Sequence, residues 1–262
     1  MGRTQRRDVE CTFLDAGGAE RCTPLSQVSP AQVLGGRPVR AFPSHKALRH
    51  YPGWWWSATM NDLVGYESLL ERDCVMTADQ DPEVSGIASQ PFWLQGLLDD
   101  GTPVRHVPDY LLAHRDGSWT VVDVKPARLA EQPEVGKVLS WTGKVAAERG
   151  WNYQVWSGAP SVRLGNLHFR AQGRRPHLVL TEIVTAIPAT GLPVTAGDAA
   201  CAGARPGISL VALQDEVAVN GRWREAEVRS ALLSCLWFGT VVVDLDRPLT
   251  NTSTVIGVRS GA

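Results

Sequence analysis

The sequence predicts an α/β fold of the α+β kind, a mixed sheet with flanking helices, followed by a smaller and mainly helical C-terminal domain. Two observations lead to this prediction. Residues 107–125 have the pattern of a β-hairpin, and residues 152–156 form a further short strand. Residues 66–78 and 133–149 have the apolar spacing of amphipathic helices. With a short strand at 90–94, the order is helix, three strands, helix and strand.

The predicted hairpin contains the most informative residues of the chain. Its first strand carries Pro108 and Asp109, and its turn contains Gly117, which can take the positive φ that a tight turn needs. Its second strand is rich in β-branched residues and runs through Asp123 to Lys125. Side chains alternate along a strand, so Asp123 and Lys125 share one face. Pairing of the two strands would place Asp109 beside Asp123.

Two carboxylates and one ammonium at one point on a sheet suit the metal-assisted hydrolysis of a phosphodiester. Mg²⁺ is bound through one or two carboxylates, with water and substrate phosphate oxygens completing its shell. The bound cation polarises the phosphate and orients a hydroxide. Lys125 can align the attacking water or stabilise the charge that grows on the phosphate. The alternative is a strand end, a turn and a surface ion pair that contributes little to stability.

The helix predicted at residues 66–78 carries Glu67 and Glu71, which are four positions apart and therefore project from the same face. Asp81, followed by a proline, ends this helix. Two acidic residues on a helix are often only solvated. This helix, however, precedes a strand and the hairpin, and in metal-dependent nucleases of this layout an acid from the first helix completes the metal site.

The remaining segments are less specific. Residues 1–50 have the pattern of a small β-containing arm, and the tryptophans at 54–56 either stack on bases or pack in a core. A basic cluster that starts at Arg170 either contacts DNA phosphates or lies in a solvated linker. Residues 191–206, rich in Gly, Ala and Pro, indicate a loop, and residues 223–237 have helical spacing.

Composition and charge restrict the class of protein. The 262 residues are 44% hydrophobic and 20% charged, as in ordinary globular proteins. The net charge of -1 argues against a free-standing, high-affinity DNA-binding protein. The five cysteines have no zinc-site spacing, which indicates a reducing cytosol. We expect no membrane segment and no secretory signal, because no apolar run approaches the roughly 20 residues that a membrane span needs.

Several motifs together resemble one known family. They are Gly65-Tyr66-Glu67-Ser68-Leu69-Leu70-Glu71, Asp81-Pro82-Glu83-Val84, Ser89-Gln90-Pro91-Phe92, Pro108-Asp109-Tyr110 and Val122-Asp123-Val124-Lys125-Pro126. In this order, over about residues 51–156, the chain resembles the N-terminal domain of the TnsA family, the endonuclease subunits of heteromeric transposases. A helix, a glycine, a strand and the run DLDRPLT at 244–250 resemble the winged-helix-like C-terminal domain of the same family.

The resemblance implies a restriction-endonuclease-like core of the PD-(D/E)xK superfamily. It implies that the protein binds Mg²⁺, with Mn²⁺ as a substitute, and cuts the DNA strand at the transposon end that its partner does not cut. The family's metal ligands fall on Glu71, Asp109 and Asp123, with Glu67 as the alternative to Glu71, and its catalytic lysine falls on Lys125. Asp123 stands where one family member has glutamine, so here this position has the superfamily's acidic form.

The resemblance also implies partners and boundaries. The partners are double-stranded DNA at transposon ends, an integrase-type transposase subunit and an ATPase regulator subunit, in the bacterial cytosol and associated with the nucleoid. The expected parts are the arm at 1–50, an endonuclease domain at 51–163 and a partner-interaction domain at 164–262. The alternatives are a stand-alone restriction or repair nuclease of the same fold and a non-catalytic module of transposition assembly.

Overall fold

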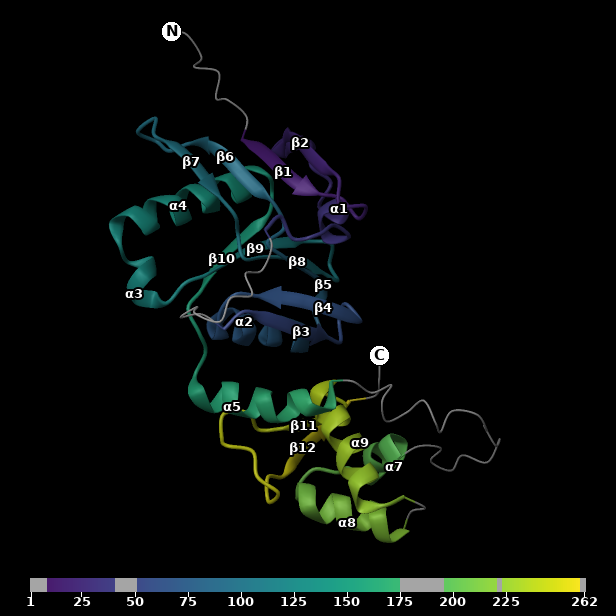
Figure 1. The fold of residues 1–262 in the computed structure, drawn as a ribbon. Helices are drawn as coiled ribbons and strands as arrows, with labels where there is room; N and C mark the ends of the chain where they lie inside the picture. Colours follow the sequence, from purple (N-terminus) through teal and green to yellow (C-terminus); the bar gives the residue numbers. More distant parts are fainter. Residues whose placement is uncertain (1–8, 41–50, 175–195, 221–222, 260–262) are drawn as a thin grey trace. The chain divides into compact units, whose positions relative to one another are not determined.

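The computed structural model describes residues 9–40, 51–174, 196–220 and 223–259, and Figure 1 shows their helices and strands. The chain divides into two compact units, Met1–Gly158 and Ala159–Ala262. Both units contain helices and antiparallel strands, so the predicted mixed α/β class is confirmed. In the part of the chain that is described, no helix combines the length and the apolar character needed to cross a membrane.

The central sheet of the first unit has the strand order β10-β9-β8-β5. The predicted hairpin is confirmed as β8 (Tyr110–His114) and β9 (Trp119–Val124), which pair antiparallel around Gly117 at φ 84°. Strand β10 (Asn152–Trp156) runs parallel to β9. A parallel neighbour requires a crossover, which here contains α4 (Pro133–Glu148), so the second predicted helix is also confirmed.

The strand predicted at 90–94 is wrong. The strand that pairs with β8 is β5 (Val84–Ser89), whereas the next strand, β6 (Trp93–Leu97), belongs to a second sheet. Gln90 at φ 42° turns the chain away from β5, and the proline that follows cannot donate a ladder hydrogen bond. The apolar run was misassigned because the buried Phe92 belongs to the connection between the two sheets.

The second sheet has the order β2-β1-β6-β7 and contains the N-terminal hairpin, β1 (Glu10–Leu14) and β2 (Glu20–Pro24). Strand β1 pairs with β6, and β6 pairs with β7 (Pro103–His106). A short 3-10 turn, η1 (Leu25–Gln27), and the helix α1 (Pro30–Leu34) follow β2. The N-terminal residues therefore complete a sheet of the first unit.

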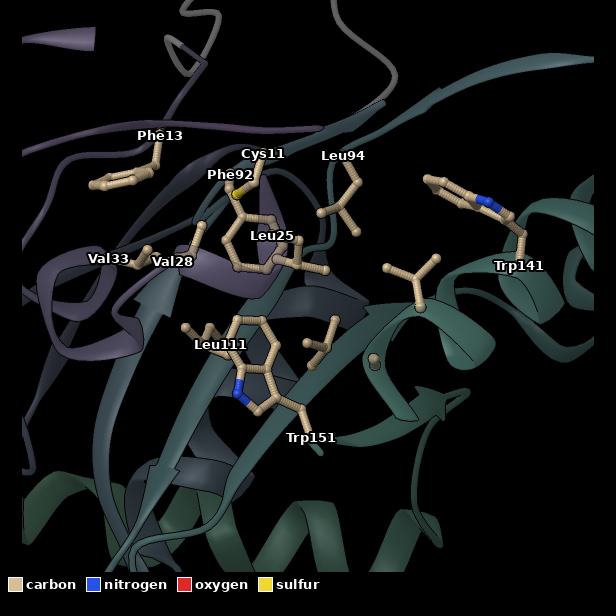
Figure 2. Close-up of a cluster of buried hydrophobic side chains, with 13 residues drawn as sticks. Cys11, Phe13, Leu25, Val28, Val33, Phe92, Leu94, Leu111, Trp141 and Trp151 are labelled. Carbon is tan, nitrogen blue, oxygen red and sulfur yellow. The ribbon is translucent and has the colours of Figure 1, made fainter. Parts of the chain in front are cut away.

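A shared hydrophobic cluster joins the two sheets and α4 (Figure 2). The rings of Phe92 and Trp151 stack with centroids 6.0 Å apart, and Trp141 of α4 packs in the same cluster. Leu111 of β8 and Cys11 of β1 contribute from opposite sheets and are fully buried. This packing fixes the position of β7 relative to the β8–β9 hairpin, which matters for the site described below.

The tryptophan run forms β3 (Gly53–Ser57), which pairs with β4 (Asp62–Tyr66). Trp55 faces inward and is buried, whereas Trp54 is 53% exposed, so only part of the run packs in a core. The predicted helix at 66–78 is confirmed as α2 (Leu69–Gln80) but begins later. It does so because Ser68 is the N-cap, and its side chain accepts a hydrogen bond from a backbone N–H of the first turn.

The second unit is mainly helical. The predicted helix at 223–237 is confirmed as α9 (Glu225–Trp237). The prediction of a loop at 191–206 is wrong for residues 196–203, which form the helix α7 (Ala196–Gly203) because alanines with high helix propensity pack into the core. The elements of the unit are α5 (Ser161–Arg170), η2 (Ala171–Gly173), α7 (Ala196–Gly203), α8 (Leu210–Asn220), α9 (Glu225–Trp237), β11 (Val241–Val243) and β12 (Val255–Val258).

Arg170 is neither a DNA contact nor part of a solvated linker, so both interpretations of the basic cluster are wrong for this residue. Its side chain is buried, and its Nε and Nη2 donate to the carbonyl oxygens of Leu236 and Trp237 at 2.7 and 3.3 Å. These carbonyls lie at the end of α9, where helix acceptors lack partners. Arg175 and His177, the other end of the predicted cluster, lie outside the described residues.

Arg170→Ala should therefore destabilise the second unit by about 3 kcal/mol, because two buried carbonyls lose a charged donor and a cavity is left. Hydrogen exchange of the α9 amides measures this effect. Arg229→Ala is the matched control, since Arg229 is exposed on the same helix and should change exchange little. Equal protection of α9 in the two variants would contradict the capping role of Arg170.

Candidate active site

Asp109 lies immediately before β8 and is tied to the end of β9. Its backbone N–H donates to the carbonyl of Val122 at 3.0 Å, and its Oδ2 accepts from the backbone N–H of Val124 at 2.6 Å. The same Oδ2 accepts from Lys125 Nζ at 3.0 Å. The side chains of Asp109 and Lys125 are 13% and 30% exposed, so the pair is partly buried but open to solvent. The hairpin thus brings these two predicted site residues together.

Asp123 lies across the hairpin from Asp109, because Tyr110 pairs with Val122 in the ladder. Its carboxylate is fully buried and both of its oxygens are hydrogen-bonded. Oδ1 is 2.8 Å from Nε2 of His106 on β7, and Oδ2 accepts from the hydroxyl of Tyr153 on β10 at 2.7 Å. Burial first, and then the charge of Asp123, raise the pKa of Tyr153 well above its ordinary value, so the hydroxyl keeps its proton and donates.

Sequence reasoning did not identify His106 or Tyr153 as partners of Asp123. Tyr153 lies on a predicted strand, but its position against β9 follows from a parallel pairing that the sequence does not reveal. His106 lies on a strand of the second sheet, and only the common core places that strand here. No local spacing connects either residue with Asp123.

Glu71 has a structural role in the first turn of α2, where it forms hydrogen bonds with the residues that begin the helix. Ser68 Oγ, at the N-cap of α2, accepts from the Glu71 N–H at 3.1 Å, and Glu71 Oε2 accepts from the backbone N–H of Glu67, the residue before the N-cap, at 2.7 Å. Glu71 is nevertheless close enough to interact with the site. Burial, and then the charge of Asp109, raise the pKa of Glu71. Glu67 lies before α2, so the prediction that it projects from the same helix face as Glu71 is wrong.

Three carboxyl groups surround one ammonium in the site. Burial, opposed by Lys125 and reinforced by Asp123, raises the pKa of Asp109. Burial disfavours the charged form of Lys125, but the carboxylates of Asp109 and Asp123 outweigh it and raise the pKa of the ammonium. Lys125 therefore stays protonated among three carboxylates, which include Glu71. Such an arrangement attracts a further cation.

Gln90 is an anomaly beside Asp109. Its backbone N–H donates to the Asp109 carbonyl at 2.8 Å, and its φ of 42° is unusual for a residue with a side chain. Its side-chain Oε1 is buried without a hydrogen-bond partner among the described residues. Strained backbone and orphaned buried acceptors both tend to occur at functional sites. The sequence pattern contained Gln90 but indicated no role for it.

The site residues fit a metal ion that needs only one or two ligands from the protein. In the described ranges, no group of three or more His, Cys, Asp or Glu side chains is arranged to hold a metal ion. Mg²⁺, however, needs only one or two carboxylates with water and phosphate oxygens. Asp109 uses Oδ2 for both of its hydrogen bonds, which leaves Oδ1 for a ligand. Asp123 is less available to a metal than Asp109, because it is fully buried and each of its oxygens already takes part in one hydrogen bond.

Comparison with known proteins adds no further assignment. No model of a known protein family matches this chain, and no curated protein is similar to it in sequence.

Proposed function

We propose that this protein is a Mg²⁺-dependent DNA endonuclease that cuts one strand at transposon ends as a subunit of a heteromeric transposase. The observation that supports this best is the pair of Asp109 and Lys125, with Nζ 3.0 Å from Oδ2 and with Asp123 and Glu71 close enough to influence Asp109 electrostatically. A buried acidic cluster around one ammonium, at the end of a hairpin, suits phosphodiester hydrolysis.

The arrangement of elements supports a restriction-endonuclease-like core. A helix that carries Glu71 precedes three antiparallel strands, and a crossover helix then leads to a parallel edge strand. The strands β6 and β7 interrupt this order and form part of the second sheet. In the described part of the second unit, the helices α7, α8 and α9 with the antiparallel strands β11 and β12 support a winged-helix-like domain, for which we propose contact with an ATPase regulator.

Each site residue has a role that follows from its surroundings. Asp109 would hold Mg²⁺, with Glu71 and Asp123 adding negative charge directly or through water. When bound, the ion polarises the scissile phosphate and lowers the pKa of a coordinated water. Lys125 is held in place by Asp109 and keeps its proton, so it can orient the attacking water or stabilise charge that develops on the phosphate.

Lys125→Ala should lower the rate of strand cleavage by about 100-fold or more, because one preorganised charge is removed. The affinity for Mg²⁺ should change far less, since Lys125 competes with the ion for the Asp109 carboxylate. Single-turnover cleavage and a Mg²⁺ titration measure the two effects. Lys137→Ala, which removes a half-exposed lysine paired with Glu134, is the control. A large loss of Mg²⁺ binding in Lys125→Ala would contradict the proposed role.

Cleavage of a transposon-end duplex in Mg²⁺, with and without an integrase-type transposase subunit, tests the proposed function. We expect cutting only when both proteins are present, because a net charge of -1 gives this chain little long-range attraction for DNA. Cutting by this protein alone would favour a stand-alone restriction or repair nuclease. Absence of cutting beside an active transposase would favour a non-catalytic assembly module.

A further inference from the structure

Two arginines stack on one tryptophan at the edge of the second sheet. Trp93 begins β6, Arg105 lies on the neighbouring strand β7, and Arg40 comes from the segment after α1. The guanidinium carbon of Arg105 is 3.7 Å from the centroid of the Trp93 ring, and that of Arg40 is 4.9 Å away. Both arginines are exposed, and Trp93 is half-buried. We name these three residues the arginine–tryptophan cluster.

The cluster concentrates positive charge without a carboxylate. Because both arginines contact one ring, their guanidinium carbons lie within about 9 Å of each other, where like charges repel. In the described part of the chain, neither arginine is within ion-pair distance of an acid. Other arginines of the chain do have acidic partners, namely Arg21, Arg72, Arg205, Arg224 and Arg247. An anion bound between the two arginines would relieve the repulsion.

The backbone connects the cluster closely to the candidate active site. Trp93 follows Gln90, whose N–H donates to Asp109, and Arg40 follows Val39, whose N–H donates to Gln90 at 3.0 Å. Arg105 is four residues before Asp109, so the two Cα atoms are at most about 14 Å apart. Phosphates advance about 3.4 Å per nucleotide along one strand of duplex DNA. This bound does not include the arginine side chain, so the cluster is within several nucleotides of a phosphate held at Asp109.

We propose that the arginine–tryptophan cluster binds the DNA backbone beside the cleaved phosphate. This inference rests on the proposed nuclease function and adds a substrate contact to it. Guanidinium groups match phosphate oxygens in a bidentate manner, and stacking on Trp93 limits the conformational entropy that they lose on binding. A local contact of this kind gives a chain with nearly balanced charge a defined place for DNA.

The test uses the full-length chain with Asp109→Ala, so that DNA is bound but not cut. Binding to a fluorescein-labelled transposon-end duplex of roughly 30 base pairs is measured by anisotropy over a range of salt concentrations. Adding Arg40→Gln and Arg105→Gln together should weaken binding about 10-fold or more at low salt. The slope of log affinity against log salt should become shallower by about two, one for each lost phosphate contact.

Two control variants separate phosphate binding from packing and from general charge. Arg21→Gln removes one positive charge from β2, where Arg21 is paired with Asp15, and should leave affinity and slope unchanged. Arg105→Lys keeps the charge but not the planar group, and should keep most of the salt slope. Unchanged binding in the double variant would overturn the inference, and so would an equal loss of binding in Arg21→Gln.

The same variants in the chain with Asp109 intact distinguish the two proposals. If cleavage requires Asp109 but the double arginine variant binds and cuts like the parent, the cluster is not a DNA contact and the nuclease proposal stands. If Asp109-dependent cleavage is weakened together with binding, both proposals are supported. If the parent neither binds nor cuts the duplex, with or without the transposase, both are overturned.

Discussion

Asp109→Asn should abolish strand cleavage, with a rate at least about 1,000-fold below that of the parent, because the proposed metal-binding carboxylate and its negative charge are lost together. Asp109→Ala should have the same effect. The measurement is single-turnover cleavage of the transposon-end duplex in Mg²⁺ with the transposase present. Calorimetric titration with Mg²⁺ should show a parallel loss of affinity, which is a readout that does not depend on activity.

Folding should change little in Asp109→Asn. Burial disfavours the charged form of this carboxyl and raises its pKa, so a neutral group of the same shape avoids that cost. The asparagine oxygen can still accept the hydrogen bond from the backbone N–H of Val124. Asp62→Asn, at an exposed position at the start of β4, is the matched control and should cut normally. Retained cleavage in Asp109→Asn would remove the proposed metal site.

Asp79→Ala should cause the largest loss of stability, about 4 kcal/mol. The Asp79 side chain, on the last turn of α2, is buried, and its carboxylate accepts four hydrogen bonds from β3 and the turn that follows. The donors are Trp55 Nε1 at 2.9 Å, Ser57 Oγ at 2.6 Å, and the backbone N–H groups of Ala58 at 3.1 Å and Thr59 at 2.8 Å. Removing the carboxylate leaves four buried or half-buried donors without their acceptor.

Urea denaturation measures this loss. Asp79→Asn keeps one acceptor oxygen and should lose about half as much stability. Asp81→Asn is the control, because the Asp81 side chain is exposed and its oxygen bond to the Glu83 N–H can persist. Cleavage by Asp79→Ala should also fall, since β4 contacts the site through Gly65, whose carbonyl accepts from the Tyr110 hydroxyl at 3.2 Å. A loss below about 1 kcal/mol would contradict the anchoring role of Asp79.

The sequence alone predicted the elements whose pattern is local. The β8–β9 hairpin follows from alternation and a turn glycine, and α4 and α9 follow from helical periodicity. The contact of Asp109 with Lys125 was predictable for the same reason, because a short turn determines the register of the hairpin that carries both. Glu71 was also located correctly on its helix, although the pattern did not separate its capping role from a metal-binding role.

Only the tertiary structure decided what surrounds that pair. The partners of Asp123 are His106 from the second sheet and Tyr153 from a parallel strand, and the arginines around Trp93 come from distant segments. The physical reason is that local patterns depend on the period of the side chains, whereas the pairing of distant strands depends on which apolar faces can be buried together. The hairpin determines the pair of Asp109 and Lys125, and the core determines their environment.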